Sequence, residues 1–173
     1  PDPSGDIGKD HYLQMVNASG GARLQAWDKY TGESVFGPVS SNILWGSFGL
    51  PTLGDGIVQY DHEAERWLIL EIQANGNNPL ASKQLFLAVS ETSDPTGEWN
   101  VYLFQTLGFP DYPKLVVWNN AYLLTVNELV NGNKSAGYAL DRAAILNNEP
   151  SFNLYRFELP SYQSIAFQPG TGA

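Results

Sequence analysis

Two aspartates, Asp55 and Asp111, are the first candidates for chemistry in the sequence. Each stands shortly before a run of apolar residues, five positions before Tyr60 and seven before Trp118. The difference between these spacings is even, so the two side chains would point to the same side of their strands. Two carboxylates at the mouth of one channel suit Ca²⁺ binding or acid–base catalysis. The alternative is that both aspartates hydrogen-bond backbone amides in the turns where their strands begin.

Tyr112 and Lys114 follow Asp111 closely and join it as candidate ligand-binding residues. Lys114 would pair with Asp111 or with a carboxylate of the ligand, or it is a solvated surface lysine. Trp45 lies in the aromatic, glycine-rich segment 45–49, whose rings would stack on sugars. Alternatively, these rings fill the groove between two structural repeats, since large aromatic side chains usually bury their area.

The segment Asp2–Asp6 carries oxygen-bearing side chains at alternate positions together with a glycine. This pattern is similar to a fragment of a Ca²⁺-binding loop, so Asp2 and Asp6 are candidate metal ligands and Ca²⁺ is the one cofactor suggested. The distal glutamate of such a loop is absent. An ordinary turn held by aspartate side chains explains the same pattern.

The composition disfavours several other chemistries. The formal net charge is −9 with only nine Lys and Arg, which argues against binding to nucleic acid or to anionic membranes. The chain has no Cys, and His11 and His62 lie far apart, which argues against a zinc site and a Ser-His-Asp triad. No apolar stretch approaches the roughly 20 residues that span a bilayer.

The elements that would position these residues are β-strands. Short apolar runs alternate with clusters of Gly, Asn, Asp and Pro, and only Ala143–Leu146 suggests a short turn of helix. The runs fall into three sets, of which the second and third each give four strands over roughly fifty residues, the repeat of a propeller blade. The expected strands are 11–17, 22–29 and 34–39; then 57–60, 67–72, 84–90 and 100–104; then 114–118, 121–127, 136–140 and 153–158.

We therefore predict an all-β chain, a β-propeller fragment of about three four-stranded antiparallel blades. Blade one covers about residues 1–40, blade two 53–104 and blade three 111–159, with a C-terminal extension at 160–173. The first set lacks an innermost strand, because residues 2–6 read as a turn. Several runs are apolar without alternation, as in strands covered on both faces, whereas a two-layer sandwich, the alternative fold, would alternate more.

Internal echoes support the repeat. Tyr12–Asn17 resembles Tyr122–Asn127, and both would be the second strand of a blade. Thr31–Glu33 recurs as Thr96–Glu98, and both would form the turn between third and fourth strands, with glycine at a positive φ. The loops that link second to third strands, and one blade to the next, would share a face with the candidate aspartates. Propeller ligands usually bind there, which is an expectation by analogy of fold.

Several motifs in order, over residues 2 to about 163, resemble a group of large secreted bacterial β-propeller proteins. They include Gly5–Gly8, Tyr60–Asp61 with Arg66–Trp67, Thr92–Gly97, and Asp111–Lys114 with Val117–Trp118. Members of this group are mostly hypothetical, surface-sorted proteins of about twice this length or more. The resemblance therefore implies the fold and the N-terminal part of a longer protein.

Two departures and one further likeness qualify this resemblance. The group often carries one cysteine near Leu50 and another near Leu85 or Phe86, so a disulfide between those segments is absent here. Asp94–Trp99 is similar to the Asp-box turn of sialidase-like propellers, with one residue too many between Asp94 and Gly97. That turn is structural in those proteins, so it bears on the fold alone.

The expected function is that of a secreted or cell-surface binding or scaffold module that recognises a glycan or a protein partner. The rival is a glycan-cleaving hydrolase or lyase, with Asp55 and Asp111 among its catalytic groups and others on further blades. A third possibility is a purely structural element of a surface array. The remaining blades would come from the same gene product or from another chain, or two copies of the chain would pair.

Overall fold

The computed structural model describes residues 2–76, 78–129 and 134–159. Within these residues, twelve strands form three four-stranded antiparallel sheets, and strands that follow one another in sequence are neighbours in their sheet. The strands are β1 (Ser4–Ile7), β2 (His11–Ala18), β3 (Gly21–Asp28), β4 (Ser34–Ser40), β5 (Thr52–Asp61), β6 (Arg66–Gln73), β7 (Gln84–Ser90), β8 (Trp99–Gln105), β9 (Phe109–Val117), β10 (Ala121–Leu129), β11 (Lys134–Asp141) and β12 (Leu154–Leu159).

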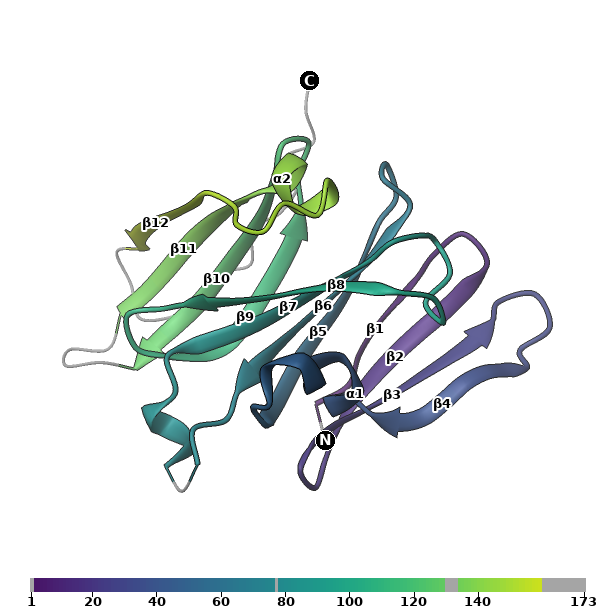
Figure 1. Cartoon of the computed structure of the whole chain (residues 1–173), viewed down its shortest axis with the longest axis horizontal. Coiled ribbons are helices and arrows are strands. Elements are labelled where there is room, and N and C mark those ends of the chain that lie inside the picture. The colour runs from purple at the N-terminus through teal and green to yellow at the C-terminus, as the bar shows by residue number, and fades with distance from the viewer. Residues whose placement is uncertain (1, 77, 130–133, 160–173) are drawn as a thin grey trace.

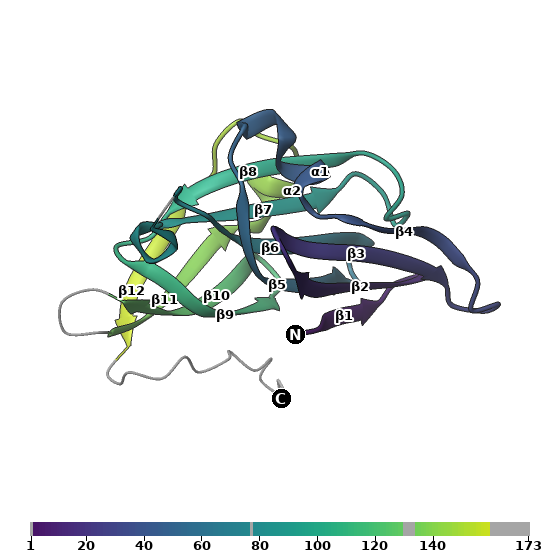
Figure 2. The same cartoon turned by 90° about the horizontal axis from the view of Figure 1, so that it is seen from below.

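The three sheets are blades that stack face to face around a common axis. Blade one is β1–β4, blade two is β5–β8 and blade three is β9–β12. Figure 2 shows the inner strands β1, β5 and β9 near one another, whereas the outer strands β4, β8 and β12 lie in three different directions. Figure 1 shows blade one and blade three at opposite ends of the molecule, with blade two between them. The fold is therefore a β-propeller segment with three blades, as the strand pattern predicts.

Blade one has an inner strand, which corrects the expectation that residues 2–6 form only a turn. Strand β1 (Ser4–Ile7) pairs with β2 over its whole length. It is also fastened to blade two by side chains: Ser4 Oγ accepts a hydrogen bond from Val58 N at 2.9 Å, and Asp6 Oδ2 accepts one from Tyr60 N at 2.8 Å. Short polar side chains that bond the neighbouring inner strand thus allow a turn-like sequence to form a strand.

Within the described residues, four short helices lie in the connections. Helix α1 (Asn42–Trp45) and the 3₁₀ helix η1 (Gly46–Phe48) join blade one to blade two, and the 3₁₀ helix η2 (Pro79–Ala81) joins β6 to β7. Helix α2 (Arg142–Leu146) follows β11 and covers the expected helical turn; its N-cap is Asp141, which accepts from the backbone of the third helical residue. None of these helices is long and apolar enough to cross a membrane.

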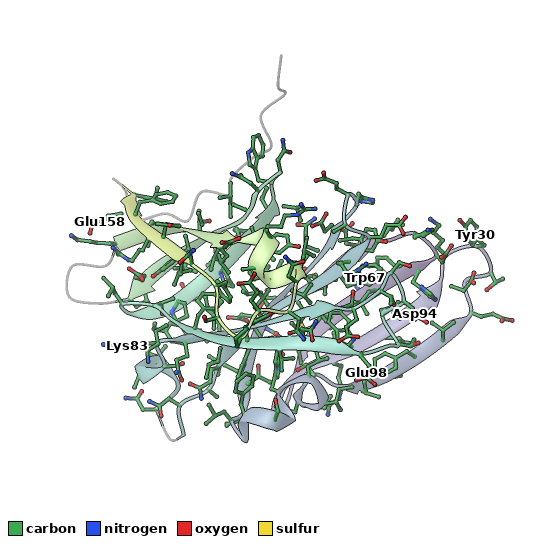
Figure 3. The ribbon with its side chains drawn as sticks, turned by 45° about the horizontal axis from the view of Figure 1, so that its top comes forward. Tyr30, Trp67, Lys83, Asp94, Glu98 and Glu158 are labelled. Atoms are coloured by element: carbon green, nitrogen blue, oxygen red, sulfur yellow. The ribbon has the colours of Figure 1, made fainter. Side chains whose placement is uncertain are left out.

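The core consists of the faces that neighbouring blades press together. In β6, Trp67 and Ile69 belong to the buried cluster shared with blade one, whereas Leu68 and Leu70 belong to the cluster shared with blade three. All four side chains are fully buried, and Figure 3 shows Trp67 inside the molecule between the ribbons of blades one and two. A strand with both faces covered explains the continuous apolar run in the sequence.

The two repeated turns lie at their predicted places. Thr31–Glu33 joins β3 to β4, and Thr96–Glu98 joins β7 to β8. Gly32 has the expected positive φ, at +74°. Gly97 does not have a positive φ, which corrects half of the prediction. The side chain of Asp94 holds this second turn instead, because it accepts a hydrogen bond at 2.9 Å from the backbone N–H two residues on.

A buried ion pair fastens blade two to blade three at the end of β5. Asp61 is fully buried and accepts hydrogen bonds from Arg142 Nε at 2.7 Å, Arg142 Nη2 at 2.9 Å and Tyr122 Oη at 2.9 Å. Burial raises the pKa of Asp61, but these hydrogen bonds, a backbone N–H and the charge of Arg142 outweigh it and hold the pKa below its usual value. The ionised carboxylate therefore links an inner strand to α2 of the next blade.

Candidate functional site

A pocket opens where the three inner strands begin, and we call it the central pocket. Its volume is about 450 Å³, and each blade contributes one stretch of chain to its wall. The lining residues are Asp2, Pro3, Ser4, Asp55, Gly56, Ile57, Asp111, Tyr112, Pro113 and Lys114. The structure thus brings together Asp55, Asp111, Tyr112 and Lys114, which the sequence placed on one face. That they bind a ligand stays a prediction.

The register of the sheets shows that Asp2 and Asp55 occupy equivalent positions, whereas Asp111 lies one position earlier in its strand. In each blade, an aromatic residue near the start of the second strand pairs with one residue of the inner strand, which we call the reference residue. The reference residues are Ile7, Tyr60 and Val117. Asp2 and Asp55 lie five residues before their reference residues, and Asp111 lies six before its own. The same register shift occurs in β5 and β9, so the residue equivalent to Asp111 is Gly54 and the residue equivalent to Asp55 is Tyr112. Asp55 and Asp111 therefore reach the pocket from neighbouring, not equivalent, positions, and the even spacing that the sequence suggested does not hold.

Two residues of the pocket have a left-handed backbone. Asp55 has a φ of +50° and Tyr112 has a φ of +52°. The register of β5 also shifts between Gly54 and Ile57. A non-glycine residue in this region costs on the order of 1 kcal/mol, and irregular backbone of this kind commonly lies where side chains are turned toward a functional site. Both inner strands are thus distorted at the pocket.

Asp55 is held in place by Asn17, which belongs to the preceding blade. Asn17 Oδ1 accepts from Asp55 N at 2.8 Å, and Asn17 Nδ2 donates to Asp55 Oδ1 at 2.6 Å. Gly54 permits this approach, because a Cβ at that position would lie 2.6 Å from Asn17 Oδ1. The two bonds fix the backbone and the carboxylate of Asp55 together, so the side chain is positioned from across the interface between blades one and two.

Asp111 has different electrostatic surroundings. Burial raises the pKa of Asp111, and the nearby negative charge of Asp55 raises it further. The backbone N–H of Tyr112 and the ammonium group of Lys114 oppose this rise only in part. The pocket therefore pairs a carboxyl group that keeps its proton to higher pH with a second carboxylate whose position is fixed.

Tyr112 and Lys114 form the rim of the pocket. The Tyr112 side chain is 57% exposed, and Lys114 Nζ lies 3.4 Å from the centroid of its ring. Lys114 Nζ also donates to Pro113 O at 3.1 Å. The ion pairs found among the described residues do not join Lys114 to Asp111, so the ammonium group lies over an aromatic ring instead of neutralising the aspartate.

Trp45 does not line the pocket, and the prediction that it offers a stacking platform for sugars is wrong. Its side chain has no exposed surface and stacks on Phe86, with ring centroids 4.7 Å apart. Trp45 Nε1 donates to Glu71 Oε2 at 2.5 Å, and Ser41 Oγ donates to the other carboxylate oxygen at 3.0 Å. The ring fills the space between blades one and two, which is the alternative that the sequence left open.

The two candidate metal ligands have separate positions. Asp2 lines the central pocket, whereas Asp6 Oδ2 accepts from Gln59 Nε2 at 3.0 Å and from Tyr60 N at 2.8 Å. Residues 4–7 form a strand and not a cation-binding loop. Across residues 2–76, 78–129 and 134–159, no group of three or more His, Cys, Asp or Glu side chains is arranged to hold a metal ion. Asp6 therefore serves to fasten β1 to β5.

Sequence reasoning missed the role of Asn17 and the place of Asp2 in the pocket. A signal for each was present. The echo of Tyr12–Asn17 in Tyr122–Asn127 ends on an asparagine in both blades, which marks that position as more than a strand residue. Asp2 would have been found by aligning the inner strands, but that alignment requires β1, which the sequence disguises as a turn.

Comparisons with known proteins agree with the fold. Among solved structures, the chain is similar to a GH43 enzyme described as a β-1,3-galactosidase, with a TM-score of 0.54 and 12% sequence identity. The match covers 87% of this chain and 34% of that one, so the chain spans about a third of the enzyme's length. Comparisons with protein families and with curated proteins find no match. At this identity the likeness shows the fold alone, which is that of a β-propeller.

Proposed function

We propose that the central pocket binds a glycan and that the chain is the glycan-recognising part of a β-propeller. The observation that carries this proposal is the convergence of three aspartates, one from each blade, beside the exposed ring of Tyr112. Carboxylates accept hydrogen bonds from sugar hydroxyls, and an aromatic ring packs on the apolar face of a sugar. The volume of about 450 Å³ lies in the range of small-ligand sites.

The charge of the pocket narrows the class of glycan. Asp2, Asp55 and Asp111 face a single ammonium group, that of Lys114, so the pocket is negative. A neutral sugar or one with a free amine suits this potential better than a uronic acid or a sulfated sugar. The glycosidase of similar fold lends support to a glycan ligand. We include a secreted or cell-surface location in the proposal, because the resemblance of the sequence to secreted propeller proteins implies it.

A glycan array followed by calorimetry tests the proposal. We expect wild-type protein to bind at least one neutral or amine-bearing glycan with a Kd in the micromolar to millimolar range, and we expect the double substitution Asp55→Asn and Asp111→Asn to weaken binding by about tenfold or more. Asp10→Asn is the matched control, because Asp10 is exposed and remote from the pocket. Titrations with and without Ca²⁺ show whether the glycan binds through a metal ion or directly to the side chains of the pocket. Absence of binding in every arm would overturn the proposal.

A second candidate function is glycan hydrolysis, which the unequal carboxyl pair favours. Most glycosidases use one protonated carboxylic acid and one carboxylate that acts as base or nucleophile. The raised pKa of Asp111 suits the acid, and the position of Asp55, fixed by Asn17, suits the second carboxylate. In this reading the pocket cleaves the glycan that it binds, and other groups of the site come from further blades.

Product analysis separates the two functions. If the pocket is hydrolytic, wild-type protein releases new reducing ends from the bound glycan, and Asp111→Asn lowers that rate by about 100-fold or more while binding persists. Unchanged turnover in the Asp55→Asn and Asp111→Asn double variant would refute these catalytic assignments. A glycan that is bound but never cleaved would refute hydrolysis and leave the binding function in place.

A further inference from the structure

A second hollow, which we call the interblade cleft, lies between blades one and two. Its volume is about 420 Å³, which is in the range of small-molecule sites, and it shares no lining residue with the central pocket. Strands β2, β3 and β4 of blade one form one wall, strands β6 and β8 of blade two form the other, and helices α1 and η1 cover one side. The cleft is thus bounded by two blades that both lie in the described part of the chain.

The interior of the cleft is apolar and reaches the buried core. Leu13, Leu24 and Ile69 line it and belong to the buried cluster that blades one and two share. Phe36 on β4 and Trp99 on β8 line it from opposite blades, and both side chains are half-buried. Water in such a space finds few hydrogen-bond partners, so an apolar body gains free energy by displacing it.

The turn between β7 and β8 forms the mouth of the cleft, and hydrogen bonds hold this turn in shape. Asp94 Oδ1 accepts from Thr96 N at 2.9 Å and from Thr96 Oγ1 at 2.8 Å. Trp99 Nε1 donates to Pro95 O at 3.2 Å, which ties the indole ring to the same turn. Pro95, Thr96 and Trp99 all line the cleft. The turn therefore gives the cleft a pre-formed wall, and a pre-formed site loses less free energy to ordering when it binds a ligand.

Glu98 determines the charge at the mouth of the cleft. Among the lining residues it alone carries a charged side chain, and it is exposed. Its carboxylate takes part in none of the ion pairs found in residues 2–76, 78–129 and 134–159, so no basic side chain there neutralises it. Figure 3 shows Glu98 close to Asp94, at the end of blade two that lies next to blade one. A carboxylate in this place attracts a cation, and the rings of Phe36 and Trp99 favour a cation as well.

We propose that the interblade cleft binds a small hydrophobic amine, which carries a protonated ammonium group on an alkyl or aromatic body. The body fills the space between Leu24, Ile69 and Trp99, and the ammonium group lies at the mouth against Glu98. A sugar fits this cleft poorly, because its hydroxyl groups need many polar partners and the apolar walls offer few. The ligand therefore differs from the glycan proposed for the central pocket, and failure of one proposal leaves the other in place.

Three probes that share a phenylethyl body test this inference. Phenethylamine, phenethyl alcohol and hydrocinnamate carry a positive, a neutral and a negative head group on that body. Each is titrated into the ¹⁵N-labelled chain at pH 7 and followed by NMR. We expect phenethylamine to bind with a Kd of about 1 mM, the alcohol to bind about threefold more weakly, and the carboxylate to bind more weakly still. The indole N–H of Trp99 and the amides of Gly97 and Val101 should shift saturably, whereas the amides of Gly56 and Tyr112 in the central pocket should not.

The substitution Glu98→Gln should weaken phenethylamine binding to about the level of the alcohol and leave binding of the alcohol unchanged. Glu91→Gln is the matched control, because Glu91 is exposed and pairs with Glu98 through its backbone N–H but does not line the cleft. It removes the same charge and should keep the preference for the amine. Circular dichroism verifies that both variants are folded.

Two kinds of result would overturn the proposal. Equal affinity for the three probes, or a preference for the amine that survives Glu98→Gln, would show that the cleft does not select an ammonium group. Absence of saturable shifts at Trp99 with every probe, or shifts confined to Gly56 and Tyr112, would show that the cleft is not the site.

Discussion

Asp55 and Asp111 carry the same side chain but differ in what surrounds it. Asn17 binds Asp55 through two hydrogen bonds, whereas burial and the charge of Asp55 act on Asp111. The sequence supplied the pair and its neighbours Tyr112 and Lys114, because aspartates before apolar runs are visible in one dimension. The left-handed backbone of Asp55 and Tyr112 was not visible, since neither residue is a glycine and the bulges arise from pairing between strands.

The link between the two aspartates gives a prediction for Asp111. Asp55→Asn removes the negative charge that helps to raise the pKa of Asp111, so that pKa should fall toward its ordinary value while the part caused by burial persists. Carboxyl ¹³C shifts followed by NMR through a pH titration measure it. Asp10→Asn should leave the Asp111 titration unchanged. An identical Asp111 pKa in the Asp55→Asn variant would show that the two carboxyl groups are not coupled.

Glu71 presents the opposite case, a buried carboxyl group with no basic side chain among its partners. Burial raises its pKa, and hydrogen bonds from the side chains of Trp45, Thr52 and Ser41 offset only part of the rise. The unfolded chain ionises this group near 4.5, the usual value. The folded state is therefore fully stabilised below that pH, and it loses stability as the pH rises through the higher folded pKa.

The substitution Glu71→Gln should remove this loss of stability at higher pH. A neutral amide keeps the shape and can still accept a hydrogen bond from Trp45, so the variant should be more stable than wild type at pH 7 by roughly 1–3 kcal/mol. The difference should shrink toward zero near pH 4. Urea unfolding at several pH values measures this difference in unfolding free energy. Asp61 and Glu128 have lowered pKa values and give the opposite dependence of stability on pH, but this contribution is the same in both proteins and cancels in the comparison. A constant difference at all pH values would contradict the raised pKa.

At the scale of elements, strands with both faces covered were the easiest to predict. The apolar runs of β6 and β7 mark blade two without ambiguity, and the predicted bounds of β7 are those observed. Strand β1 escaped prediction because Ser4 and Asp6 bond to β5 through their side chains, which makes the strand sequence look like a turn. Helix α1 escaped as well, since four residues are too few for a helical period to show.

The ion pair between Asp61 of β5 and Arg142 of α2 allows the contact between blades two and three to be tested by substitution. Arg142→Met removes the partner of Asp61 and leaves a buried, uncompensated carboxylate, so the chain should lose about 3 kcal/mol of unfolding free energy. Adding Asp61→Asn to Arg142→Met should recover part of that loss, because the buried charge is then gone. Urea unfolding at pH 7 provides both values. A loss below about 1 kcal/mol for Arg142→Met would show that the pair does not hold blade three to blade two.

At the scale of the whole molecule, the central pocket exists because three blades bring the beginnings of their inner strands together (Figure 2). Repeat length and internal echoes were enough to predict the blades from the sequence. They were not enough to predict the pocket in full, because Asn17 acts on Asp55 across a blade interface and Trp45 is removed from the surface by the same packing. Contacts between repeats are long-range, and a single sequence does not display them.

The measurement that tests the central claim most directly is NMR mapping of a bound glycan on ¹⁵N-labelled protein. Titration with a glycan selected on the array should shift the backbone amides of Asp55, Gly56 and Tyr112 saturably. Those of Lys83, which Figure 3 shows at the edge of the molecule, and of Asp94 should not move, because neither residue lines the pocket. This result would place the ligand among the three inner strands. Saturable shifts confined to residues outside the pocket, with Asp55, Gly56 and Tyr112 unmoved, would contradict the claim that the central pocket is the binding site.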